Sequence, residues 1–223
     1  MDRAEARIME ELFKEHIFGW MCRDIEAAIR GGANFLAALG LSGYTEVMGG
    51  LKTGKLLTEG RSRCNYDAFL PYLGETYVAL DKKLKGEQKD SEGNRIGLYR
   101  AVRCGLAHEY FIKGPSTVEM DSSVLDVFPG VENFNCGIKF DSGRLIFNVN
   151  IYYRDFKAGL KRYYDELLHG EGLDAFKNCL VELFKRQEVI GPTVQGSSGG
   201  VFVSAFRSRS PVRFLWLGNL SRS

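Results

Sequence analysis

The sequence predicts a mainly α-helical bundle with one small antiparallel β-hairpin inserted before its last helices. Over most of residues 2–111, apolar residues recur every three or four positions, which is the period of amphipathic helices. After Gly114-Pro115 the period changes to an alternation of apolar and polar residues, which indicates strands. The 223 residues are 44% hydrophobic and 26% charged and include five prolines, which excludes collagen-like, disordered and disulfide-scaffold classes.

Two helices and a loop are predicted at the start of the chain. Residues 2–18 carry apolar side chains at helical spacing. Residues 21–48 form a second, longer helical stretch that is rich in alanine and glycine, and Gly31-Gly32 weakens it locally. Its small residues would allow a neighbouring helix to approach closely. Residues 49–66 are glycine-rich and basic, so we expect a loop there.

Two further helices are predicted before the hairpin. A third helix fits residues 66–85, which place large apolar side chains on one side. The stretch KGEQKDSEGN, residues 85–94, is typical of a solvated connection. A fourth helix is predicted over residues 95–111, where apolar residues are again spaced by three and four, and Gly114-Pro115 ends it.

The hairpin is predicted over about residues 136–149. Apolar residues alternate on both sides of the turn sequence Asp141-Ser142-Gly143. Two final helices are predicted over residues 151–168 and 173–187. We therefore expect a four- to five-helix bundle with its hairpin in a single domain, residues 1–188.

The last stretch of the chain, residues 189–223, differs in amino-acid composition from the rest. It contains no acidic residue and no lysine but four arginines, seven serines and five glycines, and GPTVQGSSGG resembles a linker. We expect a poorly ordered appendage, with a basic arm that contacts RNA as the alternative. Residues 1–188 carry 26 basic and 28 acidic side chains, a net charge of −2, so bulk charge does not indicate a nucleic-acid binder.

The compartment predicted from the sequence is the cytoplasm. The charged N-terminal stretch does not have the pattern of a signal peptide, and no run of about 18 uncharged apolar residues indicates a membrane span. The five cysteines are odd in number, widely spaced and without a CxxC pair, so we expect reduced thiols and no zinc ribbon. They are Cys22, Cys64, Cys104, Cys136 and Cys179.

The most specific string lies in the predicted fourth helix. It is LYRAVRCGLAHEYFIKG, residues 98–114, in which four residues separate Arg103 from His108. Here the sequence resembles the HEPN superfamily, whose hallmark is R-x4-6-H in a helix near the end of a four-helix bundle. RCGLAHEYF is similar to the R-x-G-L-x-H-E-Y-F form of a group of uncharacterised bacterial HEPN-like proteins.

Two longer stretches, residues 24–54 and 138–164, also resemble that group, so the resemblance covers roughly residues 20–168. It implies the fold of a metal-independent endoribonuclease that commonly dimerises and brings two such motifs to one cleft. Many members are toxins or defence effectors, and others have lost catalysis and serve as binding modules. The expected partners are a second copy of the chain, an RNA substrate, and a protein antitoxin or other partner. No cofactor and no metal are expected.

The resemblance assigns roles to Arg103 and His108. Cleavage of RNA through its own 2′-OH requires a group that moves protons near neutral pH, which suits His108 as general acid or base. It also requires a fixed positive fork on the phosphorus centre, which Arg103 can supply. Arg100 and Glu109 lie beside them in sequence and are predicted to contact the substrate.

A catalytically silent binding or dimerisation module is the alternative. Active members usually have Asn, Asp or His after the arginine, and here Cys104 stands there. Five positions on a straight helix turn by about 140°, so the two side chains converge only if Gly105 permits a distortion or a partner subunit completes the site. In a purely structural role, His108 would be at least half-buried and Arg103 paired with a carboxylate.

Three other patterns are weaker indications of function. GGLKTGK, residues 49–55, matches the start of a P-loop, but Leu56 replaces the magnesium-binding Ser or Thr and the segment follows a predicted helix. Cys104 and His108 have the spacing of two zinc ligands, but no further ligands have matching spacing. Basic residues near this loop could contact a phosphate backbone, although such residues are usually only solvated. They are Lys52, Lys55, Arg61 and Arg63.

Overall fold

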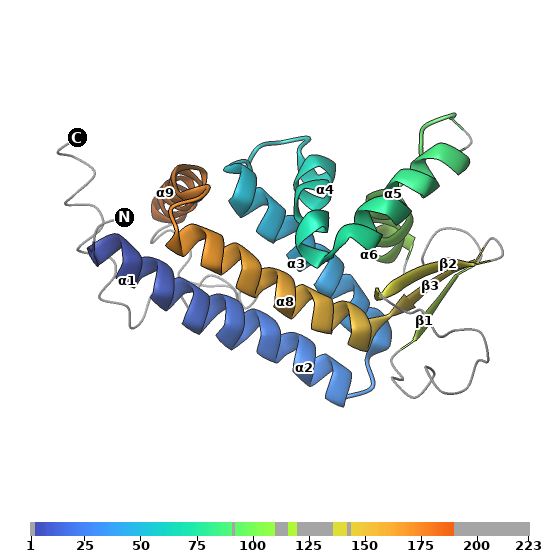
Figure 1. The fold of residues 1–223 in the computed structure, drawn as a ribbon, viewed down its shortest axis with the longest axis horizontal. Helices are drawn as coiled ribbons and strands as arrows, with labels where there is room; N and C mark the ends of the chain where they lie inside the picture. Colours follow the sequence, from blue (N-terminus) through green and yellow to red (C-terminus); the bar gives the residue numbers. More distant parts are fainter. Residues whose placement is uncertain (1–2, 91, 110–115, 120–135, 142–143, 190–223) are drawn as a thin grey trace.

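The computed structural model describes residues 3–90, 92–109, 116–119, 136–141 and 144–189. These residues form a mainly helical structure with a three-stranded sheet at one end (Figure 1). The predicted fold class, mainly α with a small β insertion, is therefore confirmed. No helix within these ranges is both long and apolar enough to cross a membrane. Of the predicted tail, only Val189 is described, as the last residue of the final helix.

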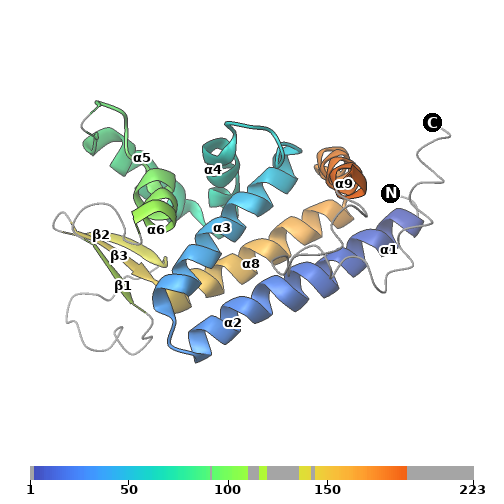
Figure 2. The ribbon, with the colours of Figure 1, turned by 180° about the vertical axis from the view of Figure 1, so that it is seen from behind.

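The first helix is longer than predicted. It consists of α1 (Arg3–Glu11), the π-helical segment η1 (Leu12–Met21) and α2 (Cys22–Arg30), which follow one another without a break. In both views it lies alongside α8 (Val149–Leu168) (Figures 1 and 2). It ends at Gly31-Gly32, where Gly32 has a φ of 72°. The prediction of one helix over residues 21–48 is thus wrong at this glycine pair, which breaks the helix rather than weakening it.

The loop predicted over residues 49–66 is wrong at both ends. Helix α3 (Asn34–Thr53) continues to Thr53, and α4 (Ser62–Leu73) begins at Ser62. Gly49 belongs to the contact between these helices, because a Cβ there would lie 1.7 Å from the carbonyl oxygen of Asn65. Gly54, with a φ of 69°, caps α3, so the segment 49–55 ends a helix and is not a P-loop.

The predicted third helix is divided in two. Helix α4 is followed directly by α5 (Glu75–Glu87), and Gly74 between them has a φ of 137°. Pro71 lies in the last turn of α4, where it has no N–H to donate to the residue four positions before it. The helical period continues across this bend, which explains why a single helix over residues 66–85 was predicted.

The motif helix consists of η2 (Tyr99–Cys104), which is π-helical, and α6 (Gly105–Glu109). The predicted helix over residues 95–111 is therefore confirmed for residues 99–109, and residues 110–115 lie outside the described ranges. Its apolar side is buried against the bundle, through Leu98, Ala101, Val102 and Leu106. The opposite side is partly or fully exposed to solvent. The segment η2 packs against α3 and α4.

The sheet contains the predicted hairpin and one strand that was not predicted. Strands β2 (Ile138–Asp141) and β3 (Arg144–Asn148) pair in antiparallel fashion, which confirms the hairpin. Strand β1 (Ser116–Glu119) pairs in parallel with β3, so the order is β1-β3-β2. Four residues with the sequence STVE are too short to show an alternating pattern.

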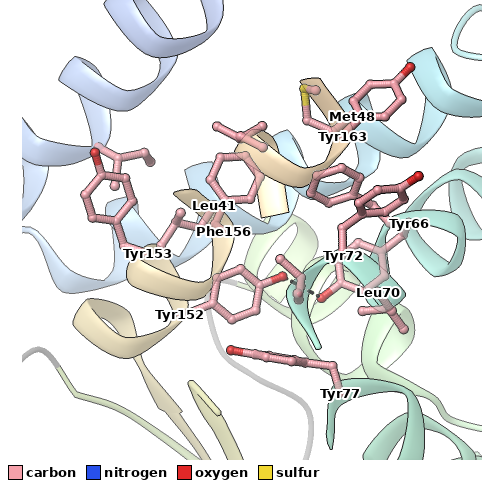
Figure 3. Packing of buried hydrophobic residues seen from close by; sticks show 14 of the residues in the cluster. Leu41, Met48, Tyr66, Leu70, Tyr72, Tyr77, Tyr152, Tyr153, Phe156 and Tyr163 are labelled. Carbon is pink, nitrogen blue, oxygen red and sulfur yellow. Dashed lines mark hydrogen bonds between the residues drawn. The ribbon is translucent and has the colours of Figure 1, made fainter. Parts of the chain in front are cut away.

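The last two helices are α8 (Val149–Leu168) and α9 (Leu173–Val189), close to their predicted bounds. Asn148 caps α8, because its Oδ1 accepts a hydrogen bond from the Ile151 backbone N–H at 3.0 Å. The core that α8 shares with α3 and α4 is rich in tyrosine (Figure 3). There the hydroxyl of Tyr152 lies 2.9 Å from Thr45 Oγ1 and 3.4 Å from the Tyr66 hydroxyl.

Four buried tyrosines predict that the fold loses stability in alkaline solution. Tyr66, Tyr77, Tyr152 and Tyr163 are at most 1% exposed. Burial raises the pKa of Tyr152 to about 12 and raises the pKa values of the other three above their usual range. Unfolded tyrosines release their protons above about pH 10, so the free energy of unfolding should fall above that pH, by about 1.4 kcal/mol per tyrosine at about pH 11. Urea denaturation across this range measures the loss, and equal midpoints at about pH 9 and pH 11 would contradict it.

Candidate functional site

The motif residue Arg103 is held against α3 by Glu46. The Arg103 Nε donates a hydrogen bond to Glu46 Oε2 at 2.6 Å, and the two side chains are 26% and 13% exposed. The Arg103 guanidinium also lies 5.9 Å from the centre of the Tyr99 ring. Arg103 is thus paired with a carboxylate, as the structural alternative predicted, but it is not sealed inside the protein.

Glu46 is a site residue that the sequence analysis missed. It is the only acidic residue of α3, whose remaining residues are mostly apolar or small. A single carboxylate in such a packed helix requires a partner, and this is the feature that would have drawn attention to it. Its hydrogen bond uses only the Nε–H of Arg103. Arginine carries further N–H groups on its two Nη atoms, and this hydrogen bond does not involve them.

His108 lies in the last turn of α6, and its side chain is exposed. His108 is therefore not a buried histidine. In the part of the chain that the structure describes, no hydrogen bond or ion pair joins His108 to Arg103. Gly105 does not provide the distortion considered above, because its φ of −58° and ψ of −52° are helical and the irregular turn precedes it. The two motif residues lie on one short segment, five positions apart.

Of the other two predicted site residues, the structure describes the side chain of Arg100 but not that of Glu109. Arg100 belongs to η2, and its Nη2 contacts Asp90 Oδ2 at 2.5 Å. Glu109 is the last residue of α6, but its side chain lies outside what the structure describes. Arg100, Cys104 and His108 follow one another at intervals of four, so they lie on roughly the same side of the segment, apart from the wider π-helical turn.

An open hollow of ≈ 340 Å³ lies beside the motif. It is lined by Tyr99, Arg100 and Cys104 of η2 and by Arg63 of α4. Arg63 was considered above as one of several basic loop residues that could contact a phosphate backbone but are usually only solvated. The structure places it in the first turn of a helix instead. Nothing in its sequence neighbourhood indicated that it would face η2, because this depends on how α4 packs.

The arginines of the hollow are more exposed than the carboxylates that hold them. Arg63 Nε lies 3.8 Å from Asp67 Oδ2, with side-chain exposures of 51% and 29%. The Arg100–Asp90 pair has exposures of 36% and 16%. Burial opposes the ionisation of Asp90, but hydrogen bonds from Asn94 and the charge of Arg100 keep its pKa below the usual range. The surface therefore presents guanidinium N–H groups, which bind anions such as phosphate in a fork geometry.

Tyr99 lines the hollow, and its ring centre lies 5.9 Å from the Arg103 guanidinium. Burial raises the pKa of the Tyr99 hydroxyl, as does its hydrogen bond with the Cys104 thiol. The ring packs edge-on against Tyr66, with centroids 5.7 Å apart. Tyr99 therefore connects the buried tyrosines to the partly exposed side of the motif segment, and its ring packs against the core through Tyr66.

No group of three or more His, Cys, Asp or Glu residues that could hold a metal ion occurs among the described residues. Comparisons with protein-family models, with curated proteins and with solved structures return no match. What the site can do is therefore argued from its own chemistry. It combines an exposed imidazole, an arginine held through its Nε, and two further arginines around a hollow. These are groups that bind a phosphodiester and move a proton.

Proposed function

We propose that this protein is a HEPN-like, metal-independent endoribonuclease in which Arg103 and His108 act on one phosphodiester. One observation carries the proposal. Arg103 is fixed through its Nε by Glu46 while His108 stands exposed on the same segment, so one group is positioned for phosphate and the other is accessible for proton transfer. The resemblance of RCGLAHEYF to the HEPN motif supports the same roles.

The proposed reaction uses the RNA's own 2′-OH as nucleophile. The 2′-oxygen attacks the phosphorus and the bond to the 5′-oxygen breaks, which leaves a 2′,3′-cyclic phosphate and a 5′-hydroxyl. His108 moves a proton, either from the 2′-OH or to the leaving 5′-oxygen, and Arg103 stabilises the negative charge that develops on the phosphoryl oxygens. A homodimer that brings two motifs to one cleft would supply a second histidine for the other proton.

We also propose that the protein acts in the cytoplasm as a toxin or defence enzyme and that a protein antitoxin restrains it. The test of the activity is incubation of the purified full-length chain with mixed RNA in EDTA. We expect cleavage, because no step requires a metal. RNA that stays intact at every protein concentration would contradict the proposal for the isolated protein.

A catalytically silent binding or dimerisation module is the second proposal, and the Arg103–Glu46 pair favours it. A 2.6 Å ion pair between η2 and α3 is also what a purely structural arginine would form. This alternative predicts that the protein binds a partner or itself without cleaving RNA. Size-exclusion chromatography with light scattering, run beside the RNA assay, separates the two proposals.

A charge-neutral substitution of Glu46 distinguishes a positioning role from a structural one. Glu46→Gln keeps the shape of the side chain but removes its charge, so Arg103 is held by a weaker hydrogen bond. If Glu46 positions Arg103 for phosphate, we expect kcat for RNA cleavage to fall about tenfold, equivalent to about 1.4 kcal/mol, with KM little changed. Steady-state kinetics and thermal unfolding are measured on the same preparation. A lower Tm with unchanged kcat would show that the pair serves only the fold.

A further inference from the structure

The hollow beside the motif is open to solvent and is lined by four residues. Its volume of ≈ 340 Å³ is at the lower end for ligand pockets, which run from about 300 to 1,000 Å³. It is formed by two elements, η2 and the first turn of α4, and it offers two guanidinium groups, a phenol ring and a thiol. This combination suits a ligand that is both anionic and aromatic.

The two guanidinium groups provide the anion-binding part. Asp90 contacts Arg100 through one Nη atom, so the other N–H groups are not used by that ion pair. Arg63 is held loosely, because its 3.8 Å partner Asp67 also accepts a 2.8 Å hydrogen bond from Lys85. The side chains of Arg100 and Arg63 are 36% and 51% exposed, and both residues line the same hollow.

Tyr99 provides the aromatic part. Its ring packs edge-on against Tyr66 and lies 5.9 Å from the Arg103 guanidinium, and Tyr99 also lines the hollow. Nucleobases stack on such rings in proteins that bind single-stranded nucleic acids, with little dependence on base identity. A base inside a duplex is stacked on its neighbours and is not available to so small a hollow.

The position of the hollow relates it to the proposed cleavage site. Arg100 precedes Arg103 by three residues, and Cys104 precedes His108 by four, so the hollow lies within about one helical turn of both motif residues. We propose that the hollow binds one unpaired nucleotide next to the scissile bond of a single-stranded RNA. Arg63 and Arg100 hold its phosphate, and Tyr99 stacks on its base. The identity of the ligand as RNA rests on the proposed function.

The test measures binding separately from cleavage. The full chain carrying His108→Ala is titrated against a labelled single-stranded RNA with 2′-O-methyl groups, which cannot be cleaved, and against a duplex of the same sequence. Fluorescence anisotropy reports the Kd. We expect the single strand to bind at least about tenfold more tightly than the duplex. In the same background, Arg63→Ala and Arg100→Ala should each weaken its binding by about five- to tenfold, as expected for a lost charge-assisted hydrogen bond.

Arg23→Ala is the matched control, because Arg23 is an exposed arginine on α2 that does not line the hollow. Equal affinity for single strand and duplex would overturn the inference, as would a loss at Arg23 equal to that at Arg63. Cleavage that depends on His108 but is indifferent to Arg63 and Arg100 would also overturn it, while the proposed function would stand. Selective binding through Arg63 and Arg100 without cleavage by the wild type would support the subsite and reject the nuclease.

Discussion

Alanine in place of His108 is expected to lower the rate of RNA cleavage by about 10²–10⁴-fold, which is the usual contribution of a general acid or base. The side chain is exposed on the last turn of α6, so its removal leaves the core unchanged. We therefore expect the circular dichroism spectrum and the Tm to match those of the wild type. The rates are compared under single-turnover conditions with the same RNA.

His169→Ala is the control for this substitution. His169 is also exposed and follows the last residue of α8, where its Nδ1 lies 2.7 Å from the Asp165 backbone oxygen. Cleavage should persist in this variant. If both histidine variants cleave RNA as fast as the wild type, His108 has no part in the reaction. If both lose activity together, the loss does not report on the motif.

The second large effect is expected at Gly49, where alanine should destabilise the fold by about 3 kcal/mol or more. A Cβ at this position would lie 1.7 Å from the carbonyl oxygen of Asn65 and 2.7 Å from its carbonyl carbon. Both atoms belong to the backbone of α4 and cannot rotate away, so α3 and α4 must move apart. For a chain of this size, a loss of about 3 kcal/mol lowers the Tm by roughly 6–12 °C.

Gly43→Ala provides the matched control on the same helix. A Cβ added at Gly43 meets nothing within 4 Å, so alanine should leave stability unchanged or raise it by up to about 1 kcal/mol through its higher helix propensity. Equal Tm values for the two variants would contradict the close packing of α3 on α4. Gly49 is also one turn from Glu46, so a folded Gly49→Ala protein should cleave RNA more slowly.

The sequence predicted the parts of the fold that depend on local periodicity. Most of the helices and the hairpin over 138–148 follow from apolar spacing alone. The errors lie where tertiary packing decides. Gly49 was assigned to a loop because glycine disfavours helices, but here the missing side chain allows two helices to touch. Strand β1 exists only through its pairing with β3.

The candidate site could be predicted only in part, because tertiary packing brings some of its residues together. The motif itself supplied Arg103 and His108, but a separation of five positions does not place both side chains on one side of a straight helix. Glu46 lies 57 residues from Arg103 in the sequence, and Arg63 comes from another helix. Only the packing of η2 against α3 and α4 brings these side chains together, and no local pattern reports it.

The most direct test of the central claim is the chemistry of the RNA ends that the protein produces. End-labelled single-stranded RNA is incubated in EDTA with the wild type and with His108→Ala, and the fragments are identified by mass. We predict fragments that end in a 2′,3′-cyclic phosphate and begin with a 5′-hydroxyl, formed by the wild type and nearly absent with His108→Ala. RNA left intact by the wild type, or cleaved equally by the variant, would contradict the assignment of Arg103 and His108 as a ribonuclease site.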